Sequence, residues 1–336
     1  MRVQKERILP LVGLITVLVL ILDGKTTTAS ALDGVTLCIQ VLIPTLFPFL
    51  VFTPMLSSGN FSVIFRPLAL LFRLRKGSES LLLSGYLGGY PVGAATVARY
   101  YRSGILSRED SNRLLPICNN PGPSFLFGIG MHLFADVKYC WLAWGIILVS
   151  SVYLGICSPG VSHVYRAGES PKLSIQELLA QGIRTMAMIC GWVVLFRIWI
   201  AILDRWILWL LPTWMRISIY GFMELANGCN ELAGVGNIGF RLLLFSGFLS
   251  FGGLCVTLQT MSAAQGLDTR SYLMGKAVQS AFTLLLATAV QFLLPVQERF
   301  FPSIPWIAIC AILCILYPLF LRKNENSGRN LYPIGV

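Results

Sequence analysis

Two adjacent asparagines stand before a helix-start signal in the stretch ICNNPGPSFLFGIG, residues 117–130. Asn119 and Asn120 precede Pro121 and Pro123, and an apolar segment that includes Ser124 follows. Asn is favoured at the N-cap and Pro in the first turn, so the spacing predicts the start of a helix. The free N–H groups of such a start suit an anionic group. Capping alone is the alternative, although two asparagines and a serine supply more donors than a cap requires.

Three further polar residues interrupt apolar sequence in the second half of the chain. Glu224 and Asn227 lie in GFMELANGCNELAG, and Gln259 lies in GGLCVTLQT. An acidic side chain within a membrane region is a candidate proton carrier or cation partner. A solvated position at the membrane interface is the alternative for Glu224, and interhelical hydrogen bonding is the alternative for Gln259.

Signals for catalysis are poor. The chain has two histidines, no H-E-x-x-H motif, no nucleophile elbow and no Walker A loop. Its nine cysteines are scattered, and the one close pair, Cys310 and Cys314, lies in apolar sequence. We therefore expect no enzyme, no catalytic residue, no metal site and no cofactor.

The composition places these residues in a lipid bilayer. Of 336 residues, 55% are hydrophobic and 12% are charged, against roughly 25% charged in soluble domains. The stretches that can cross about 30 Å of hydrocarbon, or nearly so, are 8–22, 34–56, 80–98, 139–157, 183–211, 242–262, 274–295 and 304–321. The sequence predicts an all-α polytopic membrane protein of about eight spans, a single membrane domain over 1–336 with a cytoplasmic tail at 322–336.

Charge and the N-terminal sequence predict the orientation. The net charge of +11 comes from Lys and Arg in short loops, which indicates orientation signals rather than binding of nucleic acid. The basic residues 1–7 before the apolar stretch 8–22 predict an uncleaved first span with a cytoplasmic N-terminus. A cleaved signal peptide, with an A-x-A site at 29–31, is the alternative.

Glycine and proline interrupt one apolar stretch, in SGYLGGYPVGAA, residues 84–95. Basic residues flank it at 66–76 and 99–113, so both flanks belong to the cytoplasm. A segment that starts and ends on one side does not cross, and we expect a re-entrant hairpin or broken helix. A continuous helix packed through Gly85, Gly89 and Gly93 is the alternative. The candidate site residues here are Gly89, Tyr90, Pro91 and Gly93.

The sequence resembles itself at an offset of about 162 residues. This offset aligns residues 81–108 with residues 243–270 and pairs identical Leu, Ser, Gly and Arg residues. Eight Lys or Arg residues lie in 66–113, but two lie in 228–275. If the second copy is upside down, the positive-inside rule explains this disparity. We therefore expect two inverted repeats, 34–157 and 180–295, followed by a C-terminal span at 304–321, with positions 104 and 266 on opposite sides.

Five blocks carry a resemblance to a known family: IPTLFPF (43–49), SGYLGGYPVGA (84–94), GILSREDSNRLLPICNNPGPSFLFG (104–128), MELANG (223–228) and SGFLSFGGLCVTLQ (246–259). They resemble the YlbJ (SpoVV) family of sporulation membrane proteins, in the Gate-domain or nucleoside-recognition group. The resemblance implies a transporter that moves dipicolinic acid, or a similar small anion, from the mother cell across the outer forespore membrane. A Gate-type transporter of a nucleoside-like solute and a non-transporting sporulation scaffold are the alternatives.

Residue chemistry and resemblance together give one set of expectations. The expected substrate-binding residues are Gly89, Tyr90, Pro91, Gly93, Asn119, Asn120, Ser124, Asn227 and Gln259. Glu224 would repel a dianion, so we expect it either to couple transport to protons or to be structural. The expected partners are a small anionic solute such as dipicolinate, the lipid bilayer, and other sporulation envelope proteins or a second copy of this chain.

Overall fold

The computed structural model describes residues 2–57, 60–74, 77–158 and 174–329, and every regular element in these ranges is a helix. Six of the described helices are long and apolar enough to span a membrane. They are Gly24–Leu56, Lys138–Cys157, Ile175–Trp206, Ile238–Ala263, Thr269–Leu293 and Ile304–Leu321. The protein is therefore an all-helical integral membrane protein, with six such helices where the sequence predicted about eight spans.

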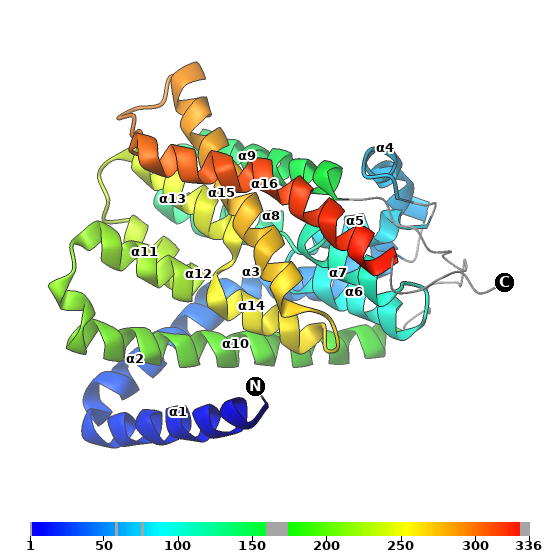
Figure 1. Ribbon diagram of the computed structural model, residues 1–336. Helices are drawn as coiled ribbons and strands as arrows, with labels where there is room; N and C mark the ends of the chain where they lie inside the picture. Colours follow the sequence, from blue (N-terminus) through cyan, green and yellow to red (C-terminus); the bar gives the residue numbers. More distant parts are fainter. Residues whose placement is uncertain (1, 58–59, 75–76, 159–173, 330–336) are drawn as a thin grey trace.

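The first part of the chain forms nine α-helices, joined by a π-helical segment, η1, and a 3₁₀ segment, η2 (Figure 1). Their bounds are α1 Arg2–Leu22, α2 Gly24–Leu37, η1 Cys38–Leu42, α3 Ile43–Ser57, η2 Asn60–Phe65, α4 Arg66–Leu71, α5 Glu79–Leu87, α6 Val92–Arg102, α7 Arg108–Ile117, α8 Pro123–Leu133 and α9 Lys138–Cys157.

The second part forms seven α-helices and a 3₁₀ segment, η3. Their bounds are α10 Ile175–Trp206, η3 Leu208–Leu210, α11 Thr213–Met223, α12 Leu225–Leu232, α13 Ile238–Phe251, α14 Gly253–Ala263, α15 Thr269–Leu293 and α16 Ile304–Arg329. Because α16 continues to Arg329, the expected tail at 322–336 begins as helix, and residues 330–336 lie outside the described part.

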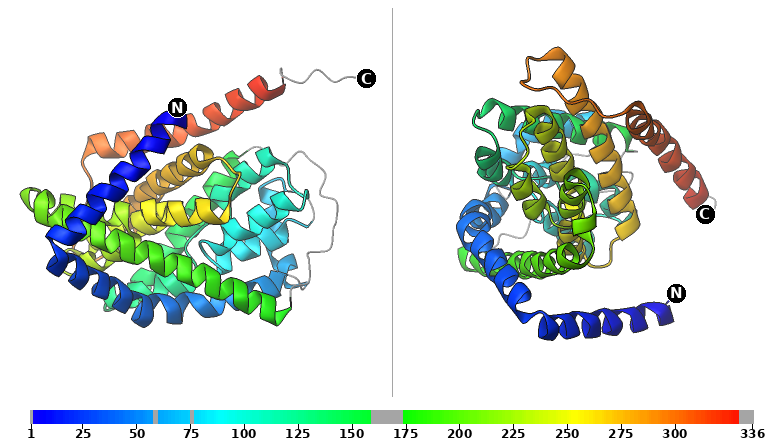
Figure 2. Two further views of the ribbon diagram at one scale, coloured as in Figure 1. Left: turned by 90° about the horizontal axis from the view of Figure 1, so that it is seen from below. Right: turned by 90° about the vertical axis from the view of Figure 1, so that its left-hand side faces the viewer.

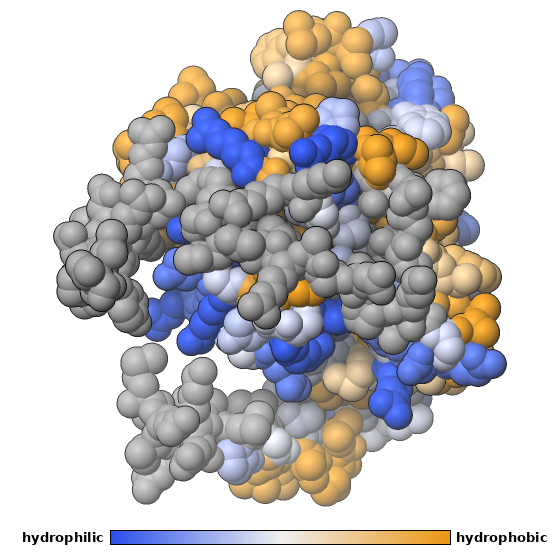
Figure 3. Space-filling model, turned by 90° about the vertical axis from the view of Figure 1, so that its right-hand side faces the viewer, coloured by the Kyte–Doolittle hydropathy of each residue, from blue (hydrophilic) through white to orange (hydrophobic). Residues whose placement is uncertain are grey.

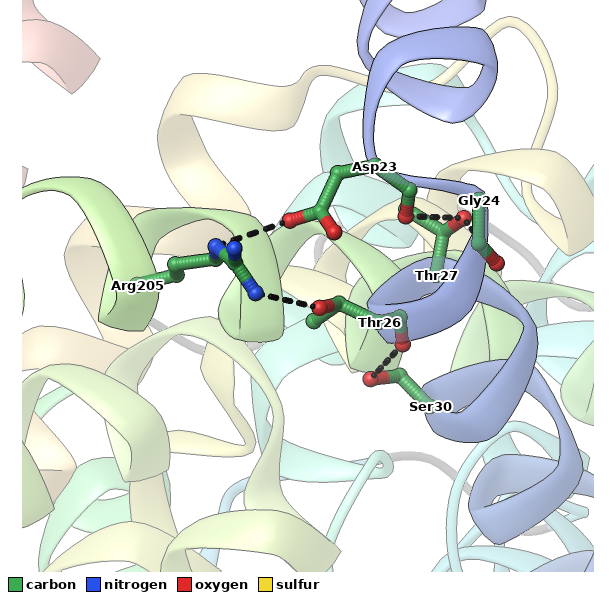
Figure 4. A network of polar contacts seen from close by, with 6 residues as sticks. All are labelled: Asp23, Gly24, Thr26, Thr27, Ser30 and Arg205. Atoms are coloured by element: carbon green, nitrogen blue, oxygen red, sulfur yellow. Dashed lines mark hydrogen bonds and ion pairs between the residues drawn. The ribbon is translucent and has the colours of Figure 1, made fainter.

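Helix α2 is held along α10 near the N-terminal end of the chain (Figure 4). Arg205 of α10 pairs with Asp23 at 3.1 Å and donates a hydrogen bond to Thr26 at 2.9 Å. Further along α2, a Cβ at Gly34 would lie 3.1 Å from the Cα of Val194, so the two helices approach closely. Residues 23–31, which the signal-peptide alternative would remove, therefore belong to a packed element. The span expected at 8–22 lies in α1, whose described apolar part, Gly13–Leu22, is short.

The stretch expected to cross at 80–98 is a helical hairpin, α5–α6, which turns at residues 88–91. A Cβ at Gly93 would lie 3.0 Å from the Cα of Gly85, a separation that two residues eight positions apart reach only if the helices fold back on each other. The segment therefore folds as the hairpin that was expected, and the continuous-helix alternative is wrong. The glycines that this alternative invoked do allow close packing. Gly85 and Gly93 bring the two arms of the hairpin together and against the backbone of Cys118.

A second hairpin, α11–α12, turns at Glu224 and was not predicted. Its arms also meet through glycines, since a Cβ at Gly228 would lie 2.1 Å from the Cα of Gly221. The two hairpins point toward each other from opposite ends of the molecule (Figure 1).

Each hairpin is followed by a helix broken in the middle and then by a long helix. The broken helices are α7–α8, interrupted at 118–122, and α13–α14, interrupted at Gly252, whose φ is +86°. The long helices α9 and α15 pack against each other. The contacts also correspond between the halves: α7 packs on α15 and α13 on α9, while α3 packs on α8 and α10 on α14.

This arrangement differs from the repeat expected from the 162-residue shift. That shift pairs the α5–α6 hairpin with α13–α14, which do not fold back on each other but form one bent span. It also predicts positions 104 and 266 on opposite sides. Instead, a Cβ at Gly266 would lie 3.5 Å from the Tyr101 ring, and the backbone N–H of Asp268 donates to Asn112 at 2.8 Å. The two loops therefore lie at the same end, and the predicted opposite placement is wrong.

The end that carries these two loops is shown in Figure 3, where hydrophilic side chains are gathered among hydrophobic ones. Asp268 caps α15 at this end. Burial raises the pKa of its carboxyl, but hydrogen bonds from Ser271 and Arg270 lower it, and the net shift is downward.

Helices α1 and α16 lie on the outside of the bundle (Figure 2). The exposed apolar side chains along the bundle, such as Ile304 at 82% and Leu293 at 81%, are suited to lipid.

Candidate functional site

Four half-helices begin near the middle of the molecule and form the candidate site. These are α6 at Val92, α8 at Pro123, α12 at Leu225 and α14 at Gly253. Helix α6 packs against α14, and α12 packs against both α8 and α14. The N-terminal end of a helix carries a partial positive charge and free N–H groups, so each of these starts favours an anionic group.

Glycine brings the turns of the hairpins into backbone contact with the broken helices. Gly89, with a φ of +71°, has no room for a side chain, because a Cβ there would lie 2.4 Å from the backbone N of Gly122. Gly253 is in the equivalent contact, with a Cβ position 3.1 Å from the carbonyl oxygens of Gly221 and Phe222. Each hairpin tip thus lies directly against the start of a half-helix.

One of the four helix starts is capped by a side chain. Glu224 accepts hydrogen bonds from the backbone N–H groups of Ala226 at 3.0 Å and Asn227 at 2.7 Å, and is 3% exposed. It is therefore buried, not solvated at an interface as its alternative proposed. The N-cap residues of the other three, Pro91, Gly122 and Gly252, make no side-chain cap.

A buried lysine lies beside the break between α7 and α8. The Nζ of Lys276, on α15, donates to the carbonyl oxygen of Asn119 at 3.0 Å, to the Oε1 of Gln279 at 2.7 Å and, more weakly, to the Oδ1 of Asn120 at 3.4 Å. Gln279 also donates to the Asn120 Oδ1 at 2.8 Å. All four side chains are at most 2% exposed. The ammonium group is thus held by neutral oxygens at the interrupted backbone.

The amide groups of the two asparagines point in different directions. Asn119 donates to the hydroxyls of Thr260, on α14, at 2.8 Å and Tyr272, on α15, at 2.9 Å. Asn120 donates to the Ile117 carbonyl at 2.7 Å and to the Ser151 hydroxyl, on α9, at 3.0 Å. Neither is an N-cap of α8, so the capping alternative is wrong. Both side chains instead tie the break to the surrounding helices.

Several predicted residues carry buried polar atoms that no described group satisfies. These atoms are the Tyr90 hydroxyl, the Asn119 Oδ1, the Ser124 Oγ and the Asn227 Nδ2. Tyr90 lies in one buried cluster with Leu225 of α12 and Cys255 of α14, and its ring is 6.0 Å from that of Phe125 on α8. Unsatisfied buried polar groups are costly and call for an explanation, of which an absent ligand is one.

Gln259 and Asn227 also make hydrogen bonds to neighbouring side chains. Gln259 donates to the Cys255 sulfur one turn earlier in α14, at 3.2 Å, so its described bond is within its own helix and not interhelical. Asn227 accepts a hydrogen bond from Arg197 of α10 at 2.5 Å, and Arg197 pairs with Asp33 of α2 at 3.6 Å. These contacts connect the second hairpin to α10 and α2.

Sequence reasoning missed Lys276, Gln279, Tyr272 and Arg197. For Lys276 the signal was available, because a lysine inside an apolar span is a functional candidate by default. Comparison of the chain with known family models, with curated proteins and with solved structures finds no match.

Proposed function

We propose that this protein is a membrane transporter for a small organic anion, which binds where the four half-helices begin. The convergence of these N-terminal ends is the observation that carries the proposal. Broken helices whose N-termini face the substrate are a recurring way for transporters to bind anionic groups. The buried amine of Lys276 adds hydrogen-bond donors next to one of these ends.

Dipicolinate, which the resemblance to the YlbJ family implies, is the solute we propose, and its chemistry is compatible with the free groups of the site. It carries two carboxylates on an aromatic ring, which require N–H and O–H donors and an apolar wall. The Asn227 amide and the Tyr90 and Ser124 hydroxyls have buried donors without a described partner, and Phe125 lies beside Tyr90. We assign Glu224 a structural role, since its carboxylate is occupied with the first N–H groups of α12.

We further propose that the two halves, α3 and α5–α9 against α10 and α11–α15, form an inverted repeat. The order of hairpin, broken helix and long helix in both halves supports this, as do the corresponding contacts. The candidate residues are buried, so the solute reaches them only if a hairpin moves. One hairpin facing each end would then act as a gate for that end, which is alternating access.

A sporulation role at the outer forespore membrane is proposed from the resemblance to the YlbJ family. The experiment that tests the transport proposal is counterflow in liposomes that contain only this protein and are loaded with unlabelled dipicolinate. Labelled dipicolinate should accumulate above the level of protein-free liposomes. Counterflow needs no assumption about the energy source, so absence of accumulation by correctly folded protein contradicts the proposal.

A nucleoside-like solute is the second candidate. The free Asn227 Nδ2 donor and Asn119 Oδ1 acceptor are the kind of pair that binds an uncharged base. Labelled uridine in the same liposomes distinguishes the two. The scaffold alternative predicts that Asn119→Ala and Glu224→Gln leave the dipicolinate content of spores normal while loss of the whole protein lowers it.

A further inference from the structure

A narrow cavity lies between α3, α6 and α10 and reaches the start of α6 at Val92. Its volume is about 20 Å³, room for a water-sized group. The residues that line it include Leu50, Val92, Thr96, Arg99, Gln181 and Thr185. It therefore admits one end of a small solute and not the whole of it.

Among the described residues that line this cavity, Arg99 is the only basic one. It is half-buried, and its Nε is buried with no hydrogen-bond partner in the described part of the chain. Thr96 lies one turn before it on α6, and Thr185 faces the cavity from α10. A guanidinium with a free donor, next to hydroxyl groups, is suited to a carboxylate, which it binds in a planar, paired geometry.

The residues that line the cavity range from the tip of the first hairpin to the outside of α10. Gln181 at one side is exposed, whereas Val92 at the other is 5% exposed and directly follows Tyr90 and Pro91 of the hairpin tip. We infer that this cavity is an access subsite, in which Arg99 binds one carboxylate of the incoming anion before the first hairpin opens. This inference rests on the proposed anion transport. It assigns to Arg99 the selection of negatively charged solutes at one entrance.

The first test compares Arg99→Gln with Arg102→Gln, which removes an exposed arginine at the end of the same helix. Loss of a charge-assisted hydrogen bond should raise the KM for dipicolinate counterflow about tenfold. The maximal rate should change less than twofold, Arg102→Gln should resemble the wild type, and Arg99→Lys should recover part of the loss. An unchanged KM for folded Arg99→Gln, when the wild type transports, overturns the subsite and leaves the transport proposal intact.

The second test measures binding without transport. Thr185→Cys places a thiol in the cavity, and its reaction with a charged methanethiosulfonate reagent in detergent should slow when dipicolinate is added. The slowing should disappear in Thr185→Cys combined with Arg99→Gln. Absence of protection overturns the subsite even if that double variant is unstable. Protection by phosphatidylglycerol but not by dipicolinate also overturns it, because the arginine would then bind a lipid headgroup.

Discussion

Lys276 is the residue on which the polarity of the candidate site depends most. In the described part of the chain its Nζ donates to the Asn119 carbonyl and to the Asn120 and Gln279 amide oxygens, and none of these acceptors is a carboxylate. A buried charge held by neutral groups is expensive in a membrane and is usually retained for function. We infer that it fixes the interrupted backbone of α7–α8 and holds a positive charge beside the start of α8.

Replacement of this lysine therefore gives the prediction at the residue scale. Lys276→Met keeps the length of the side chain but removes the charge and three donors, so dipicolinate counterflow should fall at least about tenfold. Lys138→Met is the control, because Lys138 is exposed and pairs with Asp136 at the surface. A Lys276→Met protein that melts and transports like Lys138→Met would contradict the role assigned to Lys276.

The residues that the sequence predicted are those with local signatures. Asn119 and Asn120 were found because Asn and Pro have known preferences at helix starts, although neither side chain acts as a cap. Lys276 did carry a signal, as a lysine inside an apolar span, but its role was missed because that role depends on a contact with Asn119, 157 positions away in the chain. Arg197 was missed for the same reason, since its partners come from α12 and α2.

At the scale of elements, the first hairpin depends on glycines that leave no space for a methyl group. A Cβ at Gly93 would lie 1.6 Å from the carbonyl oxygen of Cys118, so the backbone must move to accept one. Gly93→Ala should therefore lower the free energy of unfolding by at least about 1–3 kcal/mol, measured by thermal unfolding in detergent.

Gly145→Ala is the matched control for this prediction. Gly145 lies inside α9, and a Cβ there meets nothing within 4 Å. Alanine should be neutral or should stabilise the helix by about 0.5–1 kcal/mol. Equal melting temperatures of the Gly93→Ala and Gly145→Ala proteins would contradict the backbone contact between the hairpin and Cys118.

The sequence predicted the first hairpin from the basic residues on both of its flanks, but it did not predict the second. Residues 221–234 are flanked by fewer basic residues, with Arg216 before them and Arg241 after them, and the turn there is made by a buried capping carboxylate. The 162-residue alignment failed because shared glycines have different neighbours. Gly85 lies against the Cys118 backbone, whereas the aligned Gly247 lies against the Leu284 side chain. Similar packing residues do not establish equivalent elements.

At the scale of the whole molecule, the ends at which the loops lie can be tested by labelling. Ser103 and Gln265 are exposed and lie in the α6–α7 and α14–α15 loops. Ala233 is exposed and precedes the span Ile238–Ala263, which Gln265 follows, so the two lie at opposite ends of that span. Cysteines at 103 and 265, in a cysteine-free background, should react with an impermeant reagent from the same side of the membrane, and a cysteine at 233 from the other. Reaction of 103 and 265 from different sides would contradict the fold.

The central claim is that the convergent helix starts select a small solute by its negative charge. The most direct measurement is competition against labelled dipicolinate counterflow by unlabelled dipicolinate and by pyridine-2,6-dicarboxamide, which has the same ring and nearly the same size but no charge. Dipicolinate should compete at least about tenfold more effectively, since hydrogen bonds to charged groups are stronger than those to neutral ones. Equal competition by the diamide would contradict an anion site.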